Sequence, residues 1–340
     1  MKRLKVVQIG IGHDHAIWAW GSLKKQTDIF DVIGWCPIDD EGERPAIKYY
    51  PAEERLTLKE VLIRDDIDAV FIETDDWNLT NYAQIFVERG IAVHMDKPGS
   101  VSQEDFEKLA RTVRDKQVAF QLGYMYRFNP MIMEVVKNAR NGVYGNINTV
   151  EIQMSCEHSK AKRDWLARFK GGMLYFLGCH LIDLIIQIKG IPADIIPLSY
   201  RSGYDDAKGE DVGLAIFKYP NCVAFAKTSG VEPGGFMRRQ LVITGKTCNI
   251  ELRPLENFSP GPENVITKMR FSEPGKGWTS DGEYYNSKPH DRYDNMFAFF
   301  AAIVRGEKEN PYSLEYECQL HRVILAACGH EIDYKMPVKL

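Results

Sequence analysis

The 340-residue sequence lacks several features that would assign it to a membrane, nucleic-acid-binding or secreted class. It contains no run of about 18 apolar residues, so we expect no membrane-spanning helix. Lysines and arginines form no basic stripe and the formal net charge is −4, which argues against nucleic acid as the main partner. Residues 1–4 lead directly into a strand pattern, without the apolar segment and cleavage site of a secretory signal.

Cysteine pairs are also missing. The seven cysteines are an odd number at scattered positions without CxxC spacing, which is typical of reduced thiols in a cytoplasmic protein. No internal repeat is present. The length exceeds what one small core needs, so we expect two domains, over residues 1–124 and 125–340. The C-terminal helices are expected to pack back on the first domain.

The first part of the chain alternates between apolar strand patterns and amphipathic helix patterns. This alternation predicts right-handed crossovers and a doubly wound parallel α/β sheet. A capping box, Thr57-Leu58-Lys59-Glu60, marks the start of a short helix. We expect strands at residues 4–9, 32–36, 68–73, 91–95 and 118–122, and longer helices at 13–25, 78–89 and 102–116.

The pattern changes near residue 146, where alternating strands begin to dominate. They predict an α+β domain with a large, mostly antiparallel open sheet. The segment 272–290 is rich in Gly, Ser, Pro and Asp and is predicted as a surface loop. We expect strands at 146–156, 193–201, 211–218, 223–229, 239–244 and 248–252, and helices at 172–188, 292–305 and 313–329.

Gly10-Ile11-Gly12 follows the first strand and precedes a helix, as in the front half of the GxGxxG fingerprint. The first glycine permits a tight turn, and the second lets the backbone approach a pyrophosphate at the helix N-terminus. The third fingerprint position is His15 rather than glycine. The alternative is a structural turn without a phosphate.

An acid at the end of the second strand usually holds the adenosine ribose of a dinucleotide. The expected position here is Pro37, and the nearest acids are Asp39 and Asp40. Arg44 is the first arginine after the strand and lies seven residues beyond Pro37. We therefore expect NAD as the cofactor, with NADP as the alternative.

His13-Asp14-His15 raises the question of a metal site. Two histidines at i and i+2 do not share a helix face, and the sequence fixes no third ligand near them. We expect no metal here, and interpret the segment as a helix N-terminus with an acid near its dipole.

Asp96-Lys97-Pro98 follows the fourth strand, where open α/β sheets bind their ligands. The proline fixes the backbone behind the lysine. A lysine held in this way can polarise or deprotonate a substrate hydroxyl. The alternative is an exposed loop lysine, which is the common state of lysine in proteins.

Taken together, these motifs resemble the Gfo/Idh/MocA oxidoreductases, the glucose-fructose oxidoreductase and inositol dehydrogenase group. The resemblance covers nearly the whole chain and adds three further matching segments. They are Thr74-Asp75-Asp76 after the third strand, the segment Gly123-Tyr124-Met125-Tyr126-Arg127-Phe128-Asn129-Pro130, and the segment 171–183 that contains His180 and Asp183.

The resemblance implies a Rossmann domain followed by a domain whose open sheet often forms an oligomer interface. It implies hydride transfer between a nicotinamide and a secondary alcohol, with Lys97 and His180 as catalytic residues. Candidate substrate-binding residues are Asp183, Phe176, Tyr126, Arg127 and Trp165. Candidate cofactor-binding residues are Gly10, Ile11, Gly12, His13, Asp39, Thr74, Asp75, Trp77, Asp96, Lys97 and Pro98.

Several positions depart from the family pattern. Asp96 replaces the glutamate of a Glu-Lys-Pro motif, and Phe176 stands where an aspartate four residues before His180 is common. Leu79 replaces a histidine that often follows the third strand. Phe176 could provide a stacking surface for a sugar or simply pack in the core. Arg127 could bind substrate or pair with an acid.

These residues are compatible with three functions. The first is a dehydrogenase for a sugar, polyol or glycoside that assembles as a homo-oligomer, a dimer or tetramer. The second is a glycoside-cleaving enzyme in which transient oxidation makes a neighbouring proton acidic. The third is a sugar- or dinucleotide-binding regulatory protein without catalysis.

Overall fold

The computed structural model describes residues 2–258, 261 and 263–340. By their contacts these residues form two compact units. The first unit contains residues 1–125, 293–321 and 338–340, and the second contains 126–292 and 322–337. No helix in the described ranges combines the length and the apolar character needed to cross a membrane.

The sheet of the first unit has five strands in the order β2-β1-β3-β4-β5, and every neighbouring pair is parallel. This confirms the predicted doubly wound sheet. The strands are nearly continuous apolar runs because helices cover both faces of such a sheet. Their bounds are β1 Leu4–Ile9, β2 Phe30–Cys36, β3 Ala69–Ile72, β4 Ala92–Met95 and β5 Phe120–Leu122.

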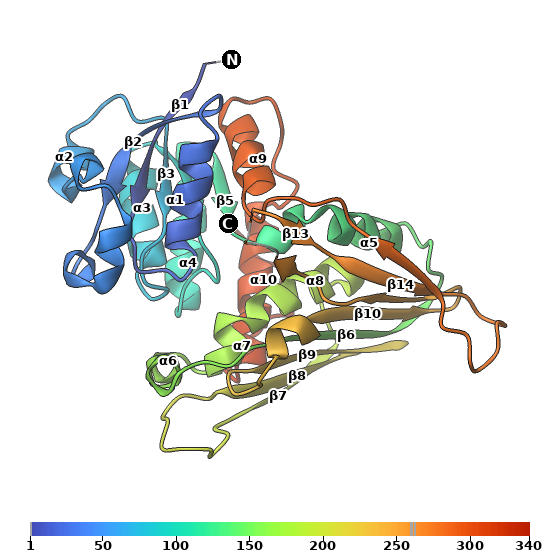
Figure 1. The fold of residues 1–340 in the computed structure, drawn as a ribbon. Helices are drawn as coiled ribbons and strands as arrows, with labels where there is room; N and C mark the ends of the chain where they lie inside the picture. Colours follow the sequence, from blue (N-terminus) through green and yellow to red (C-terminus); the bar gives the residue numbers. More distant parts are fainter. Residues whose placement is uncertain (1, 259–260, 262) are drawn as a thin grey trace. The chain divides into compact units, whose positions relative to one another are not determined.

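Helices alternate with these strands (Figure 1). The Thr57–Glu60 capping box is formed in both directions, and the Ser102 side chain accepts the amide of Asp105. The first helix begins at Ala16 rather than at His13, because the residues before it form a turn. The bounds are α1 Ala16–Lys25, α2 Leu58–Leu62, α3 Leu79–Glu88 and α4 Gln103–Lys116.

The helix α9 (Asp294–Val304) completes the core of the first unit although it is distant in sequence. The ring of Phe297 lies 4.8 Å from that of Phe71 and 5.0 Å from the imidazole of His94. Phe300 meets Phe71 edge-on at 5.5 Å. Aromatic rings in such edge contacts add to the stability that their burial provides.

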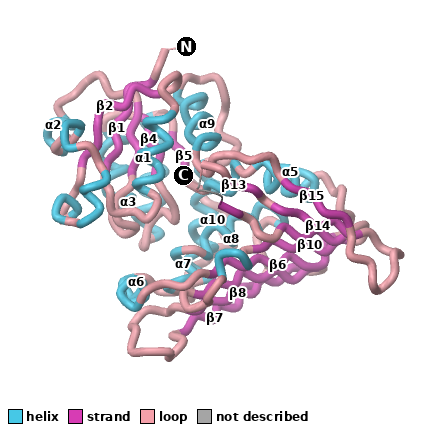
Figure 2. The backbone as a smooth tube through the Cα atoms, viewed as in Figure 1, coloured by secondary structure: helices cyan, strands magenta, loops and turns pink. Residues whose placement is uncertain are grey.

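The second unit is built on an eight-stranded sheet, drawn in magenta in Figure 2. Its order is β15-β14-β11-β10-β6-β9-β8-β7, and only the β6–β9 pair is parallel. The bounds are β6 Ile147–Ser155, β7 Asp194–Tyr200, β8 Val212–Tyr219, β9 Cys222–Ser229, β10 Gln240–Gly245, β11 Asn249–Leu252, β14 Lys268–Ser272 and β15 Glu283–Asn286. A separate pair joins β12 (Asn257–Phe258) to β13 (Val265–Ile266).

Helices α7 (Gly172–Phe176) and α8 (Gly178–Lys189) pack on the central strands of this sheet, and α5 (Pro130–Arg140) packs on α8. The helix α6 (Lys160–Trp165) precedes them, and α10 (Leu314–Ala327) ends the helical part of the chain. The buried face of β8 and β9 is lined by small and apolar side chains such as Ala215, Phe217 and Ala224.

Two predictions about the second unit were wrong. Residues 172–188 are not one helix, because the chain breaks at Leu177, where Gly178 approaches the Leu174 side chain too closely for a Cβ. Residues 272–290 are not wholly a loop, because β15 pairs with β14 from Lys268↔Asn286 to Phe271↔Glu283. This edge strand is exposed and the segment around it is rich in polar residues and glycine. It was therefore predicted as a loop, although it contains Tyr284 and Tyr285, which favour strands.

The contacts of α9 predict that two phenylalanines of that helix contribute differently to the free energy of unfolding. Phe297→Ala should lower the free energy of unfolding by about 3–5 kcal/mol, because it empties a fully buried site between Phe71 and His94. Phe299→Ala is the matched control, since that side chain is only half-buried and should cost less. Chemical denaturation would measure both, and equal losses would contradict this account of the core.

Candidate functional site

The glycine turn is closely packed by the loop that follows β3. Gly10 has a positive φ of 90°, and a Cβ there would lie 2.6 Å from the backbone nitrogen of Thr74. A Cβ on Gly12 would lie 2.8 Å from the nitrogen of Asp75 and 2.4 Å from a carboxylate oxygen of Glu41. Both glycines are therefore required by neighbouring protein atoms.

Glu41 is a residue of this site that sequence reasoning missed. Its Oε2 accepts the amide of Ile11 at 2.8 Å and the amide of Ile38 at 3.0 Å. The residue is only 2% exposed, and burial raises the pKa of its carboxyl group to about 7. The signal for it was an acid soon after a strand whose expected acid position is Pro37.

Two other carboxylates near the turn bind Arg44. The guanidinium donates to both oxygens of Asp75, at 2.8 and 2.6 Å, and to Asp40 at 2.6 Å. Asp39, the predicted ribose acid, is exposed and accepts from Asn78 at 2.8 Å and from the Tyr82 hydroxyl at 2.9 Å. The Asp39 side chain thus joins the end of β2 to α3.

The turn has features that fit a dinucleotide. In the described part of the chain, the amide of Gly12 donates no hydrogen bond to a protein atom, so it is available to a phosphate oxygen. A hollow of about 280 Å³ opens beside it. The hollow is lined by Ile11, Gly12, His13, Asp14, Ile17, Arg44, Ala46, Tyr49 and Tyr50. Among the other predicted cofactor residues of this unit, Thr74 and Asp75 are buried and Trp77 is half-buried.

Asp96 is the centre of a buried network at the end of β4. Its Oδ2 lies 2.9 Å from Nδ1 of His15 and 3.1 Å from Nδ1 of His13. Its Oδ1 accepts the backbone amide of Lys97 at 2.6 Å. Gly123 makes room for the carboxylate, because a Cβ there would lie 2.9 Å from Oδ1.

The two histidines of this network carry different charges. Burial disfavours the imidazolium of His13, but the carboxylates of Asp96 and Asp76 outweigh burial and raise its pKa to about 10. Burial lowers the pKa of His15 to about 4 despite its contact with Asp96. At neutral pH, His13 is therefore protonated and His15 is neutral.

The acids around His13 also differ from one another in the direction of their pKa shifts. Burial opposes the charged form of Asp96, but His13 and His15 hold its pKa well below the usual range. Burial and the nearby Asp96 raise the pKa of Glu73 well above its usual range. Asp76 lies 3.6 Å from Nε2 of His13. The protonated His13 thus compensates the buried negative charge of Asp96.

Lys97 is fully buried, with 0% of its surface exposed. This excludes the alternative of a solvated loop lysine. Its peptide bond to Pro98 is cis, and the Pro98 carbonyl accepts the Tyr124 hydroxyl at 3.4 Å. The next residue, Gly99, accepts the Thr80 hydroxyl at 2.8 Å. The backbone on both sides of the lysine is held by hydrogen bonds.

The expectation that no third group stands near His13 and His15 was wrong. Both histidines precede α1 instead of lying on it, and both reach Asp96. One ligand atom from each of the three residues lies within 4.8 Å of the others, a spacing that could hold a metal ion. In the structure Oδ2 of Asp96 contacts Nδ1 of both histidines directly, as in a hydrogen-bonded network.

In the second unit, His180 lies in the first turn of α8 and is 1% exposed. Its ring meets the ring of Tyr126 edge-on at 5.3 Å. The Tyr126 hydroxyl donates to Glu256 at 2.5 Å, and Glu256 also binds Arg239 and Arg292. Burial opposes ionisation of Glu256, but the two arginines hold its pKa below the usual range. Tyr126 therefore connects His180 to a buried ion cluster.

Asp183, one turn beyond His180, is bound by Arg127. The guanidinium donates from Nε at 3.0 Å and from Nη2 at 2.9 Å to the two carboxylate oxygens. Gln187 adds a third hydrogen bond at 2.9 Å. Both members of the ion pair are 1% exposed. Of the two roles considered for Arg127, substrate binding or pairing with an acid, the structure shows the pairing with an acid.

Phe176 belongs to an aromatic group with Trp165, whose ring it meets edge-on at 5.5 Å. The ammonium of Lys162 lies 3.5 Å from the centre of the Trp165 ring and 4.4 Å from that of Phe176. Phe176 is 3% exposed, while Trp165 is half-buried. Trp165 and Phe176 together form an aromatic wall, to which Lys162 contributes a cation–π contact.

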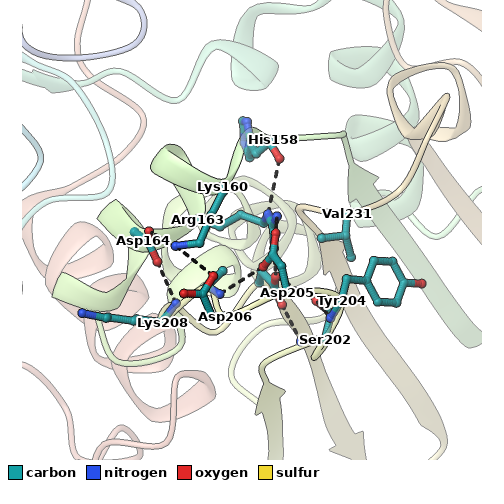
Figure 3. A network of polar contacts seen from close by, with 12 residues as sticks. His158, Lys160, Arg163, Asp164, Ser202, Tyr204, Asp205, Asp206, Lys208 and Val231 are labelled. Carbon is teal, nitrogen blue, oxygen red and sulfur yellow. Dashed lines mark hydrogen bonds and ion pairs between the residues drawn. The ribbon is translucent and has the colours of Figure 1, made fainter.

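The helix α6, which carries Trp165, is fastened by Arg163 (Figure 3). The guanidinium of Arg163 binds Asp205 and Asp211 and donates to the carbonyl of His158. Asp211 in turn accepts the amide and the hydroxyl of Ser202. These contacts fix the position of the aromatic wall within the second unit.

Comparison with protein families assigns both parts of the chain. Residues 4–124 match an oxidoreductase family with an NAD-binding Rossmann fold, and residues 132–251 match the GFO/IDH/MocA C-terminal domain. The chain belongs to the Gfo/Idh/MocA family. The NAD-binding Rossmann fold that this family model describes lies in the first unit.

Two curated relatives are inositol dehydrogenases. The scyllo-inositol 2-dehydrogenase (NADP(+)) IolW of Bacillus subtilis is 24% identical over 54% of this chain and 52% of that protein. Inositol 2-dehydrogenase of Rhizobium meliloti is 28% identical over 77% of this chain and 78% of its own length. The chain thus spans about half the length of the first relative.

Solved structures share the fold at lower identity. KijD10, a 3-ketoreductase from Actinomadura kijaniata in complex with NADP and TDP-benzene, has a TM-score of 0.78 and 16% identity, covering 96% of this chain and 97% of its own. The WlbA dehydrogenase from Chromobacterium violaceum, in complex with NADH and UDP-GlcNAcA, has a TM-score of 0.76 and 15% identity, covering 96% and 93%.

The charge on His13 predicts a dependence of stability on pH. Its pKa is about 10 in the folded protein against about 6.5 in the unfolded chain, so its contribution is complete below pH 6.5 and disappears as pH rises through 10. The difference in unfolding free energy between wild type and His13→Gln should therefore shrink by more than about 1 kcal/mol from pH 6 to pH 10. Denaturant titrations would measure it, with His290→Gln, a half-buried histidine of the second unit, as the control. A constant difference would contradict the protonation of His13.

The Arg127–Asp183 pair predicts a non-additive pair of substitutions. Arg127→Met should lower the free energy of unfolding by about 3–5 kcal/mol, because it leaves a buried carboxylate without its guanidinium. The double variant Arg127→Met, Asp183→Leu should recover most of that loss. Additive losses in denaturant melts would show that the two side chains act separately.

Proposed function

We propose that the protein is an NAD-dependent dehydrogenase acting on a secondary alcohol of a sugar, a polyol or a glycoside. The observation that carries the proposal is the fully buried Lys97. It is the second residue after β4, at the carboxyl edge of a sheet that matches an NAD-binding Rossmann fold, where such sheets bind their ligands. The two inositol dehydrogenases among the relatives support a polyhydroxylated substrate.

In this proposal Lys97 and His180 are the catalytic residues. A bound nicotinamide would supply the acceptor for the hydride of the alcohol carbon. His180 would take the hydroxyl proton on an imidazole nitrogen, since an ordinary histidine titrates near neutral pH. The ammonium of Lys97 would donate a hydrogen bond to the same oxygen and stabilise its developing negative charge.

Other predicted residues take supporting roles in the proposal. The glycine turn, His13, Asp39, Thr74, Asp75, Trp77, Asp96 and Pro98 would contact or position the cofactor. Tyr126, Phe176 and Trp165 would contact the substrate, because aromatic faces suit the apolar faces of sugar rings. Arg127 and Asp183, which bind each other, would hold α8 and thereby His180 in place.

A second candidate is a glycoside-cleaving enzyme that oxidises its substrate transiently. Elimination after oxidation needs a further acid or base beyond the pair that handles the hydroxyl. His15 favours this candidate, because it is neutral at physiological pH and is held by Asp96, the residue before Lys97. Release of aglycone with catalytic NAD and no net reduction would separate this reaction from simple dehydrogenation.

We further propose that the chain forms a homo-oligomer through the open sheet of the second unit. The outward positions on the strands at one end of that sheet include Leu198, Tyr200 and Val223, which are 45%, 57% and 43% exposed. Large apolar side chains gathered on one sheet face are typical of an interface. Light scattering of the purified protein measures the assembly, and a monomer would contradict this part of the proposal.

The catalytic proposal predicts the effect of removing the lysine charge while keeping its volume. Lys97→Met should retain NAD binding, measured by calorimetry, while hydride transfer falls by about 10²–10⁴-fold. The readout is absorbance of the reduced nicotinamide with a panel of sugars, polyols and glycosides. Lys116→Ala, an exposed lysine at the end of α4, is the control and should change neither measurement.

Two results would contradict the proposal. One is a Lys97→Met variant that turns over as fast as wild type. The other is a wild-type protein that binds NAD and a sugar yet transfers no hydride with any member of the panel, as expected for a regulatory binding protein.

A further inference from the structure

Two arginines share one buried carboxylate in the second unit. Glu256 is 1% exposed and binds both Arg239, which is 6% exposed, and Arg292. The Tyr126 hydroxyl donates to the same carboxylate, and the Tyr126 ring meets the imidazole of His180. Tyr126, Arg239, Glu256 and Arg292 form the Glu256 cluster, in which two guanidiniums face one carboxylate. One positive charge is therefore in excess within the cluster.

Arg292 by itself is a sufficient partner for Glu256. Its Nε lies 2.6 Å from Oε1, and its Nη2 donates to Oε2 at 3.0 Å. This two-point geometry is the strongest form of contact between a guanidinium and a carboxylate. Arg239 makes a weaker contact, because only its Nη1 reaches Oε2, at 3.2 Å. The guanidinium in excess is therefore that of Arg239.

Arg239 keeps one edge of its guanidinium unused. Within residues 2–258, 261 and 263–340, its buried Nε has no hydrogen-bond acceptor and its Nη2 donates to no protein atom. Nε and Nη2 form the same edge with which Arg127 binds both oxygens of Asp183 in this unit. Because a buried charge and unused donors are both costly, this edge indicates an anionic ligand.

The surroundings of Arg239 hold the guanidinium in a fixed place. Its central carbon lies 4.1 Å from the centre of the Phe236 ring, which meets the Phe258 ring edge-on at 4.9 Å. The Arg239 amide donates to the Phe236 carbonyl at 3.2 Å, and the Arg239 carbonyl accepts the Leu255 amide at 2.9 Å. Both rings are half-buried. A donor edge that is ordered in advance binds its ligand at a lower entropic cost.

The charge of the cluster distinguishes between two kinds of anion. A carboxylate carries one negative charge, which equals the excess positive charge, and its two oxygens match the planar edge of a guanidinium. A phosphate monoester carries about −1.5 to −2 at neutral pH and would leave negative charge in excess. The cluster therefore favours a carboxylate.

We propose that Arg239 binds a carboxylate of the substrate through Nε and Nη2, and that the substrate is a sugar acid. This inference rests on the proposed dehydrogenase function and adds the class of substrate. The Glu256 cluster is suited to this role because Tyr126 belongs to it and contacts His180, the proposed acceptor of the hydroxyl proton.

Matched pairs of sugars test the proposal. The pairs are glucuronate with glucose, galacturonate with galactose and gluconate with glucitol, and glucose 6-phosphate represents the phosphate class. Absorbance of the reduced nicotinamide gives kcat/KM, and calorimetry of glucuronate binding gives a readout that needs no turnover. In at least one pair, wild type should favour the acid by about 10–100-fold, the contribution of hydrogen bonds between charged groups. Glucose 6-phosphate should not share this preference.

Three variants assign the preference to one side chain. Arg239→Met should lose it, and Arg239→Lys should keep only part, because an ammonium lacks the two-point edge. Arg238→Met is the matched control, since that side chain is 50% exposed and bound to Glu232, and it should keep the wild-type preference. Circular dichroism confirms folding. If Arg239→Met does not fold, an unchanged preference in Arg239→Lys decides against the proposal.

The two proposals fail in different ways. Hydride transfer from neutral sugars without a preference for any acid, or a preference that persists in folded Arg239→Met, overturns the carboxylate site and leaves the dehydrogenase proposal standing. Binding of glucuronate that depends on Arg239, without hydride transfer from any sugar, supports the carboxylate site and overturns the dehydrogenase. A wild type that neither binds nor oxidises any of the acids overturns the carboxylate site.

Discussion

The Asp96 carboxylate is the contact on which the candidate site of the first unit depends. It joins the end of β4 to the two histidines before α1 and holds the backbone of Lys97. One departure from the family pattern lies here, aspartate for glutamate at position 96. Its carboxylate contacts His15, which stands at the third position of the glycine fingerprint. The protonated His13 then compensates the buried negative charge.

The sequence allowed the sheet of the first unit to be predicted because its strands are continuous apolar runs between turn and cap signals. The capping box at Thr57 was found for the same reason, since its two partners are three residues apart. Glu41 and His15 could not be placed in this way. Their partners, Ile11 and Asp96, lie 30 and 81 residues away, and loop geometry decides where such side chains point.

In the second unit, the sequence pattern likewise predicts a helix without predicting where it is interrupted. An apolar pattern predicts helical residues around His180, but not the break at Leu177 that separates α7 from α8. The pairing of Asp183 was open, because an acid one turn from a histidine can orient the ring or bind elsewhere. Arg127 decides it by binding both carboxylate oxygens in a buried site. Either charge alone would be costly to bury, so each of the two groups requires the other as its partner.

The glycine turn shows which part of a nucleotide fingerprint is diagnostic. Gly10 and Gly12 are already required by Thr74, Asp75 and Glu41, so glycine at these positions serves the fold before any ligand binds. Their presence alone therefore does not distinguish a cofactor site from a tightly packed turn. The distinguishing group is a polar atom that the packing leaves open: among the described residues, the amide of Gly12 donates to no protein atom. An open backbone amide in such a turn is a group that a phosphate oxygen can use and that a purely structural turn does not require.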